Sequence, residues 1–100
     1  MAREIVWSHQ AADDLYALAE YINWDSSFYA NAFAEQFWDK SLSFDEFPER
    51  GRIVPELGNP KIRELLIREY RLIYVIEQSR IVILAIVHGS RDLKTLWDKN

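Results

Sequence analysis

The second half of the chain contains three runs of strand-forming residues that follow one another almost without interruption. The runs cover Ile62–Ile67, Tyr70–Glu77 and Arg80–His88, and two residues separate each from the next. Connections this short force neighbouring strands to run antiparallel, so the spacing predicts a three-stranded meander. Neither connection contains glycine, which leaves the turn types open.

A short strand and two helices are expected before the meander. Arg3 to Trp7 has strand propensity, and Ser8 is suited to cap a helix that runs to about Trp24. A second apolar stripe with helical spacing runs from Ala30 to Phe44, and Pro48 closes it. Because so few residues join the two helices, they must form an antiparallel hairpin.

The expected architecture is α+β, with an N-terminal strand, a helical hairpin, the antiparallel meander and a short C-terminal helix from Arg91 to Lys99. The segment from Glu49 to Lys61 is expected to be a loop, because it contains glycine, proline and asparagine. The first strand would join the sheet at an edge, since a lone strand leaves its backbone unpaired. One hundred residues predict a single domain, 1–100. The aromatic residues of the helical half are expected to lie mostly in the hairpin core: Phe28, Tyr29, Phe33, Phe37, Trp38, Phe44 and Phe47.

Composition excludes several kinds of site. There is no cysteine and the two histidines are isolated, so no disulfide, metal site or cofactor is expected. The N-terminus lacks an apolar signal core, and no apolar run is long enough to span a bilayer, which predicts a cytoplasmic protein that makes no membrane contact.

Charge is distributed unevenly. The net charge of −4 argues against a nucleic-acid binder. Residues 1–47 carry 2 basic and 9 acidic side chains, whereas residues 48–100 carry 10 basic and 7 acidic ones. Either the helices have an ordinary acidic surface, or a working surface is confined to the sheet half.

Three residues could form a phosphodiester-cleaving set. If the second turn of the meander holds two residues, Arg71 faces Ile86 and His88 lies opposite Glu69, so Arg71 and His88 share a face. Arginine can hold a phosphate through two hydrogen bonds, and histidine can transfer a proton near neutral pH. Glu56, on the preceding loop, could be the general base. The alternatives are a solvated histidine, a solubilising edge arginine and an ordinary loop acid.

Other residues of this half could contact a substrate or a partner. Arg52, Arg63 and Arg91 are the candidates for contact with an anionic substrate, unless they belong to a solvated rim. Trp97 is the candidate for a partner contact, unless it seals the sheet. Further cations surround the same half: Arg50, Lys61 and Arg68.

The chain resembles the RelE/ParE superfamily of toxins from bacterial type II toxin–antitoxin systems. The resemblance begins with the opening strand and the serine-capped helix that carries Asp14-Leu15. It continues, in order, through Gly51–Glu56, Ile62–Leu65, Tyr70–Tyr74 and Ile83–Arg91, and so covers nearly the whole chain. It implies a small growth-inhibiting toxin that forms a hetero-oligomer with an antitoxin encoded beside it.

The superfamily divides into two kinds of activity. ParE-like members act on DNA gyrase without nucleophilic chemistry of their own, and the long helical hairpin and the segment from His88 to Leu93 resemble theirs. RelE-like members cut mRNA in the ribosomal A site, where the residues matching Glu56, Arg71 and His88 would be general base, phosphate holder and general acid. The acidic net charge departs from that branch. The favoured interpretation is therefore a gyrase-directed toxin, the alternative is a ribosome-dependent mRNA endonuclease, and a third is an inactive or purely binding member.

Overall fold

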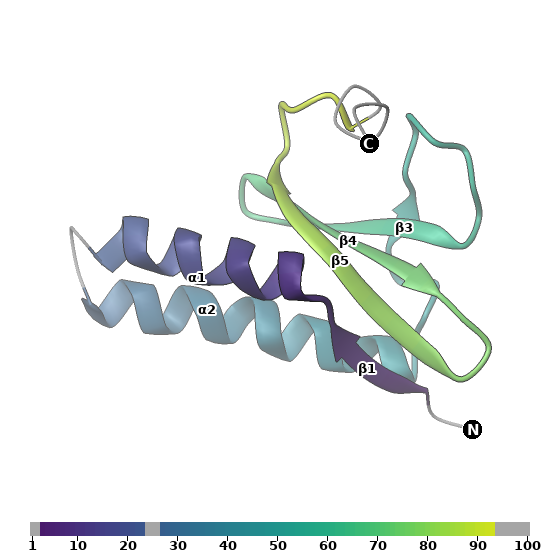
Figure 1. Ribbon diagram of the computed structural model, residues 1–100, viewed down its shortest axis with the longest axis horizontal. Helices are drawn as coiled ribbons and strands as arrows, with labels where there is room; N and C mark the ends of the chain where they lie inside the picture. Colours follow the sequence, from purple (N-terminus) through teal and green to yellow (C-terminus); the bar gives the residue numbers. More distant parts are fainter. Residues whose placement is uncertain (1–2, 24–26, 94–100) are drawn as a thin grey trace.

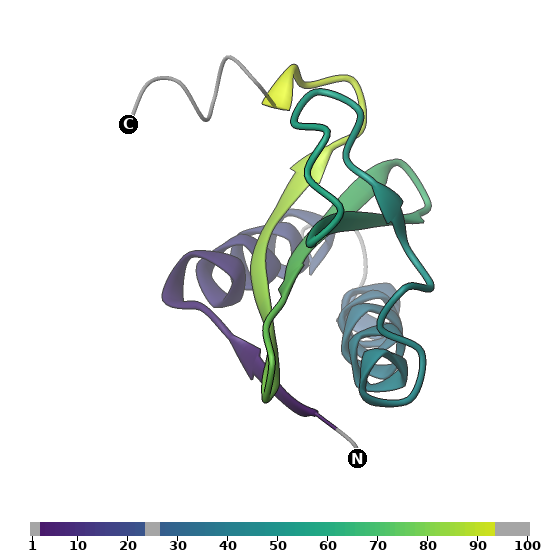
Figure 2. The same cartoon turned by 90° about the vertical axis from the view of Figure 1, so that its right-hand side faces the viewer.

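The computed structural model describes residues 3–23 and 27–93. The elements are β1 (Glu4–Trp7), α1 (His9–Asn23), α2 (Ser27–Leu42), the short 3-10 helix η1 (Ser43–Asp45), β2 (Arg52–Ile53), β3 (Ile62–Ile67), β4 (Tyr70–Ile76) and β5 (Arg80–His88). The strands form one sheet in the order β1-β5-β4-β3-β2, and the helical hairpin covers one face of it (Figures 1 and 2). The predicted α+β architecture is confirmed. The end of the predicted C-terminal helix, with Trp97, lies outside the described residues. No helix in the described part is long and apolar enough to cross a membrane.

Strand β1 lies at the edge of the sheet, as predicted. It pairs in parallel with the first half of β5, with Glu4 opposite Arg80 and Trp7 opposite Ile83. Ser8 then ends the strand and caps α1, because its Oγ accepts a hydrogen bond from the backbone N–H of Ala11 at 3.0 Å.

A β-bulge interrupts the pairing of β4 with β5. From the turn to Ile83 the register is the predicted one, but beyond it Ile73 pairs with Ala85, so Leu84 is an extra residue. Ser8 holds this bulge: its N–H donates to the carbonyl of Ile83 at 2.9 Å, and its hydroxyl donates to the carbonyl of Leu84 at 3.1 Å. Every residue of β5 beyond Leu84 therefore faces the opposite side of the sheet from the predicted one.

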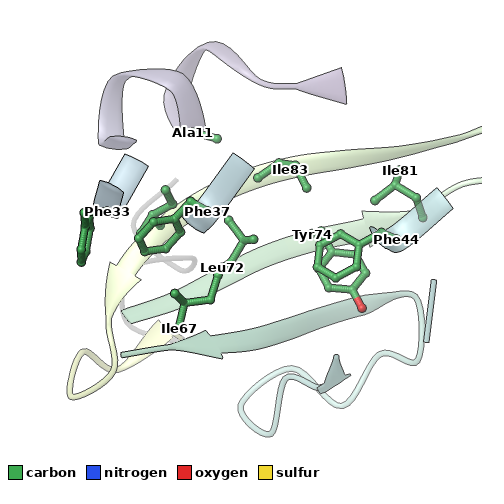
Figure 3. Close-up of a cluster of buried hydrophobic side chains, with 10 residues drawn as sticks. Ala11, Phe33, Phe37, Phe44, Ile67, Leu72, Tyr74, Ile81 and Ile83 are labelled. Carbon is green, nitrogen blue, oxygen red and sulfur yellow. The ribbon is translucent and has the colours of Figure 1, made fainter. Parts of the chain in front are cut away.

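The main core lies between the helices and the sheet (Figure 3). The buried side chains of this cluster are Ala11, Phe33, Phe37, Phe44, Ile67, Leu72, Tyr74, Ile81, Ile83 and Ile86. Of the seven aromatic residues predicted for the hairpin core, Phe33, Phe37 and Phe44 are buried. The prediction was wrong for the other four, which are between 49% and 75% exposed: Phe28, Tyr29, Trp38 and Phe47. Phe47 lies beyond the end of α2, and Trp38 stacks on Trp7 of the edge strand, with ring centroids 6.1 Å apart.

The opposite face of the sheet carries a smaller core. Val54, Ile73 and Leu93 are buried in it, so the segment after β2 and the segment after β5 both fold back over the strands. The expected loop from Glu49 to Lys61 was wrong in one part, because Arg52 and Ile53 pair with β3 as a fifth strand. Two residues are too short to show a strand pattern in the sequence.

Helix α1 provides a hydrogen-bond acceptor for the part of β5 that has no pairing with β1. The Oδ2 atom of Asp14 accepts a hydrogen bond from the backbone N–H of Ile86 at 2.9 Å, and Oδ1 accepts one from Gln10 at 2.8 Å. Ile86 is only 6% exposed, so this carboxylate replaces the carbonyl that a longer neighbouring strand would provide.

We expect Asp14→Ala to lower the free energy of unfolding by about 1–3 kcal/mol, because the buried N–H of Ile86 loses its acceptor. Asp14→Asn keeps an acceptor oxygen and is expected to cost less. Urea unfolding of both variants measures the difference. Equal losses for alanine and asparagine would show that the hydrogen bond to Ile86 is not what the carboxylate contributes.

Candidate functional site

Arg71 is the centre of a buried ion-pair cluster on the sheet face away from the helices. Its side chain is 5% exposed. Its Nε donates to Oε1 of Glu64 at 2.6 Å, and Nη1 and Nη2 donate to the two carboxylate oxygens of Glu56 at 2.8 and 2.7 Å. Nη1 also donates to the backbone carbonyl of Arg91 at 3.1 Å. Carboxylates therefore engage all three guanidinium nitrogens.

Glu64 completes the cluster, although its role was not predicted. Its side chain is fully buried, and its Oε2 accepts a hydrogen bond from Nε of Arg52 at 2.6 Å. Glu64 pairs with Ile73 across β3 and β4, which makes Arg71 its diagonal neighbour. The two-residue turn between these strands was sufficient to predict this contact. The cluster joins two cations to two anions, so it carries no net charge.

Glu56 ties the C-terminal segment to the cluster. Besides its bonds to Arg71, it accepts a hydrogen bond from the backbone N–H of Leu93 at 3.0 Å. The hydrogen bonds from Arg71 hold the pKa of Glu56 at about 2, and the bonds to Glu56 raise the pKa of Arg71 further above its ordinary value. A carboxylate with so low a pKa is a weak proton acceptor at neutral pH.

The low pKa predicts an acid-dependent contribution to stability. Because the pKa of Glu56 falls from 4.5 to about 2 on folding, the stabilisation is complete above about pH 5 and is lost as the pH falls toward 2. We expect Glu56→Gln to lower the free energy of unfolding by about 2 kcal/mol at pH 7 and by much less at pH 2.5. Unfolding curves of both proteins across this range provide the test. A gap that stays constant with pH would contradict the ion pair.

His88 does not join Arg71, and the prediction that they share a face was wrong. Past the bulge Arg71 pairs with Val87, and His88 pairs with Tyr70 rather than lying opposite Glu69. The two side chains therefore point to opposite faces of the sheet. The ring of His88 packs edge-on against Tyr70, with centroids 5.6 Å apart, and its Nδ1 lies 2.8 Å from Oγ of Ser90.

The three arginines predicted to contact a substrate lie in three places. Arg52 is paired with Glu64 at the ion-pair cluster. Arg63, near the start of β3, donates hydrogen bonds to the backbone carbonyls of Pro60 and Gly51. Arg91 lines a groove of about 590 Å³ between α1 and β5, where His88 is also found. The structure thus brings Glu56 together with Arg71, whose guanidinium also contacts the backbone of Arg91. His88 lies on the other face of the sheet, so it does not join Glu56 and Arg71.

The ion-pair cluster is a closed arrangement. In the part of the chain that is described, every buried side-chain nitrogen or oxygen has a hydrogen-bond partner. Among the same residues, no group of three or more histidines and carboxylates could hold a metal ion. A phosphate could reach Arg71 only by displacing a carboxylate. The cluster therefore has a structural role: it links the loop that carries Glu56, the sheet and the C-terminal segment at Leu93.

Known proteins match this chain over most of its length. A family model described as the ParE toxin of the type II toxin–antitoxin system, parDE, matches residues 5–93. A protein of Caulobacter vibrioides named Toxin RelE2 is 32% identical over 89 residues, which are 88% of this chain and 97% of that protein. A solved structure described as a chromosomal ParDE TA system from P. aeruginosa has the same fold, with a TM-score of 0.72 at 19% identity. That match covers 87% of this chain and 96% of the other.

Proposed function

Because the chain belongs to the ParE toxin family of type II toxin–antitoxin systems, we propose that its cellular target is DNA gyrase. The protein is the toxin component of such a system, and its partner is an antitoxin. The proposed target derives from the resemblance of the helical hairpin and of the segment from His88 to Leu93 to the gyrase-directed branch. If gyrase is the target, the protein acts in the cytoplasm.

The state of Arg71 is the observation that carries this proposal. An endonuclease would need a guanidinium free to hold the scissile phosphate and a histidine beside it to protonate the leaving group. Here Glu56 and Glu64 occupy the guanidinium, and His88 lies on the other face of the sheet. These features support a toxin that acts by binding its target rather than by cutting RNA.

Exposed apolar side chains on α1 and α2 support this surface of the helices as the docking site of the antitoxin. Six large apolar side chains of α1 and α2 are at least 45% exposed: Tyr16, Tyr21, Phe28, Tyr29, Trp38 and Leu42. Residues 1–47, which contain both helices, carry 9 acidic and 2 basic side chains. An antitoxin segment that presents apolar side chains between cations would complement this surface.

A supercoiling assay with purified gyrase tests the target. We expect the toxin to abolish supercoiling, and its induction in cells to cause DNA-break signalling while translation continues. Addition of the cognate antitoxin is the control, because it should restore supercoiling. Full supercoiling activity at saturating toxin would refute the gyrase proposal.

The variant His88→Ala distinguishes the alternative function. Because the Caulobacter relative is named Toxin RelE2, a ribosome-dependent mRNA endonuclease is kept as that alternative. We expect His88→Ala to retain full toxicity, because the ring is 47% exposed and lies on the opposite face of the sheet from Arg71. A rapid fall in protein synthesis with cut mRNA, lost in this variant, would instead make the protein a nuclease.

A further inference from the structure

Three cations gather at the corner of the sheet where β1 and β3 begin. Arg3, Lys61 and Arg63 line one cavity of about 310 Å³ there, together with Glu77 and Gln78 from the connection between β4 and β5. We call these three residues the basic corner. The corner lies at the opposite end of β4 and β5 from the groove that contains His88.

Backbone carbonyls fix the two guanidinium groups of the basic corner. Nε of Arg63 donates to the carbonyl of Pro60 at 2.9 Å, and its Nη1 donates to the carbonyl of Gly51 at 3.1 Å. Nε of Arg3 donates to the carbonyl of Glu77 at 2.8 Å. These bonds orient both side chains without neutralising them, and Nη2 of each has no partner among the described residues.

The charge of the basic corner is not neutralised by ion pairs. Among the described residues, Arg52, Arg71 and Arg80 each pair with a carboxylate, whereas the three cations of the corner do not. Two carboxylates line the same cavity, Glu49 and Glu77. Glu77 is engaged by Arg80, so of these two carboxylates only Glu49 has no ion pair within the described residues.

We propose that the basic corner binds the phosphate backbone of duplex DNA. Oriented guanidinium groups with free N–H donors, beside a lysine, match the oxygens of a phosphodiester. The contact carries no base information, so it would hold DNA without regard to sequence. The inference rests on the proposed action on gyrase: DNA is the substrate of that enzyme, so a toxin bound to gyrase lies close to DNA.

Fluorescence anisotropy with a labelled duplex of about 16 base pairs tests this binding, measured as a function of salt concentration. Three phosphate contacts predict a slope of log K against log[salt] of about −3 for the intact protein. Lys61→Gln should reduce the magnitude of the slope by about one, and the double variant Lys61→Gln/Arg63→Gln by about two. The matched control is Arg68→Gln, at the other end of β3, which should leave the slope unchanged.

Several outcomes would overturn the inference: no binding by the intact protein, the same slope in both corner variants, an equal loss in the control, or tighter binding of a single-stranded RNA of the same length. If the double variant does not fold, Lys61→Gln alone still provides the test, since the Lys61 side chain is exposed and forms no hydrogen bond or ion pair with the described residues. The supercoiling assay separates the two proposals. Gyrase inhibition without DNA binding refutes the basic corner alone, and DNA binding without gyrase inhibition refutes the gyrase target alone.

Discussion

Replacing Arg71 with methionine is expected to lower the free energy of unfolding by about 3–5 kcal/mol, because it leaves the buried carboxylate of Glu64 without its main partner. Glu64 is fully buried, and its remaining cation, Arg52, has a side chain that is 61% exposed. Glu56 would lose its partner in the same step, and with it the hold on the segment at Leu93. Urea unfolding followed by fluorescence measures the loss.

Two companion variants show whether the buried charge is the cause. Arg80→Met breaks an exposed ion pair with Glu77 and should change stability little. The double variant Arg71→Met/Glu64→Leu removes both charges, so it should be more stable than Arg71→Met alone. If the double variant were the less stable of the two, the cost of the single substitution would lie in lost packing rather than in an unpaired charge.

Phe44→Ala is the second large effect, with an expected loss of about 3–5 kcal/mol in the free energy of unfolding. Phe44 is fully buried, and its ring stacks on Tyr74 with centroids 3.9 Å apart. Tyr74 in turn donates its hydroxyl hydrogen to the carbonyl of Pro48 and accepts the N–H of Gly51, both at 2.8 Å. A cavity beside this ring would therefore loosen the connection from the helices to β2 as well as the core.

Phe47→Ala is the matched control, because the same side chain three residues later is 59% exposed. We expect its free energy of unfolding to stay within about 0.5 kcal/mol of the parent protein. Thermal and urea unfolding of the two alanine variants should separate them clearly. Similar losses would mean that Phe47 contributes as much to the fold as Phe44 does.

The sequence was sufficient to predict the elements that local patterns determine. The bounds of β3 and β5 were predicted to the residue, because two-residue connections leave little freedom. The serine cap of α1 follows from an equally local rule, and the edge position of β1 follows from the need to pair the backbone of a lone strand. Strand β2 escaped prediction because Arg52 and Ile53 are extended only through their pairing with β3.

The candidate site was predicted in part. The proximity of Glu56 to Arg71 was anticipated, but as a catalytic pair rather than as an ion pair. The separation of Arg71 from His88 depends on one extra residue, Leu84, which has neither the glycine nor the polar side chain that could mark a bulge. What fixes this bulge is Ser8, which is far away in the sequence.

The pairing of β1 with β5 also determines when the sheet of a newly made toxin can be completed. Glu4 pairs with Arg80, and Ser8 bonds to Leu84, so each residue has its partner 76 positions further along the chain. At ordinary rates of translation, the ribosome needs on the order of ten seconds to cover that distance. Until then the first strand has no neighbour, and such distant pairings also form slowly once both strands exist. The sheet of a newly made toxin can therefore be completed only after its last strand has been synthesised.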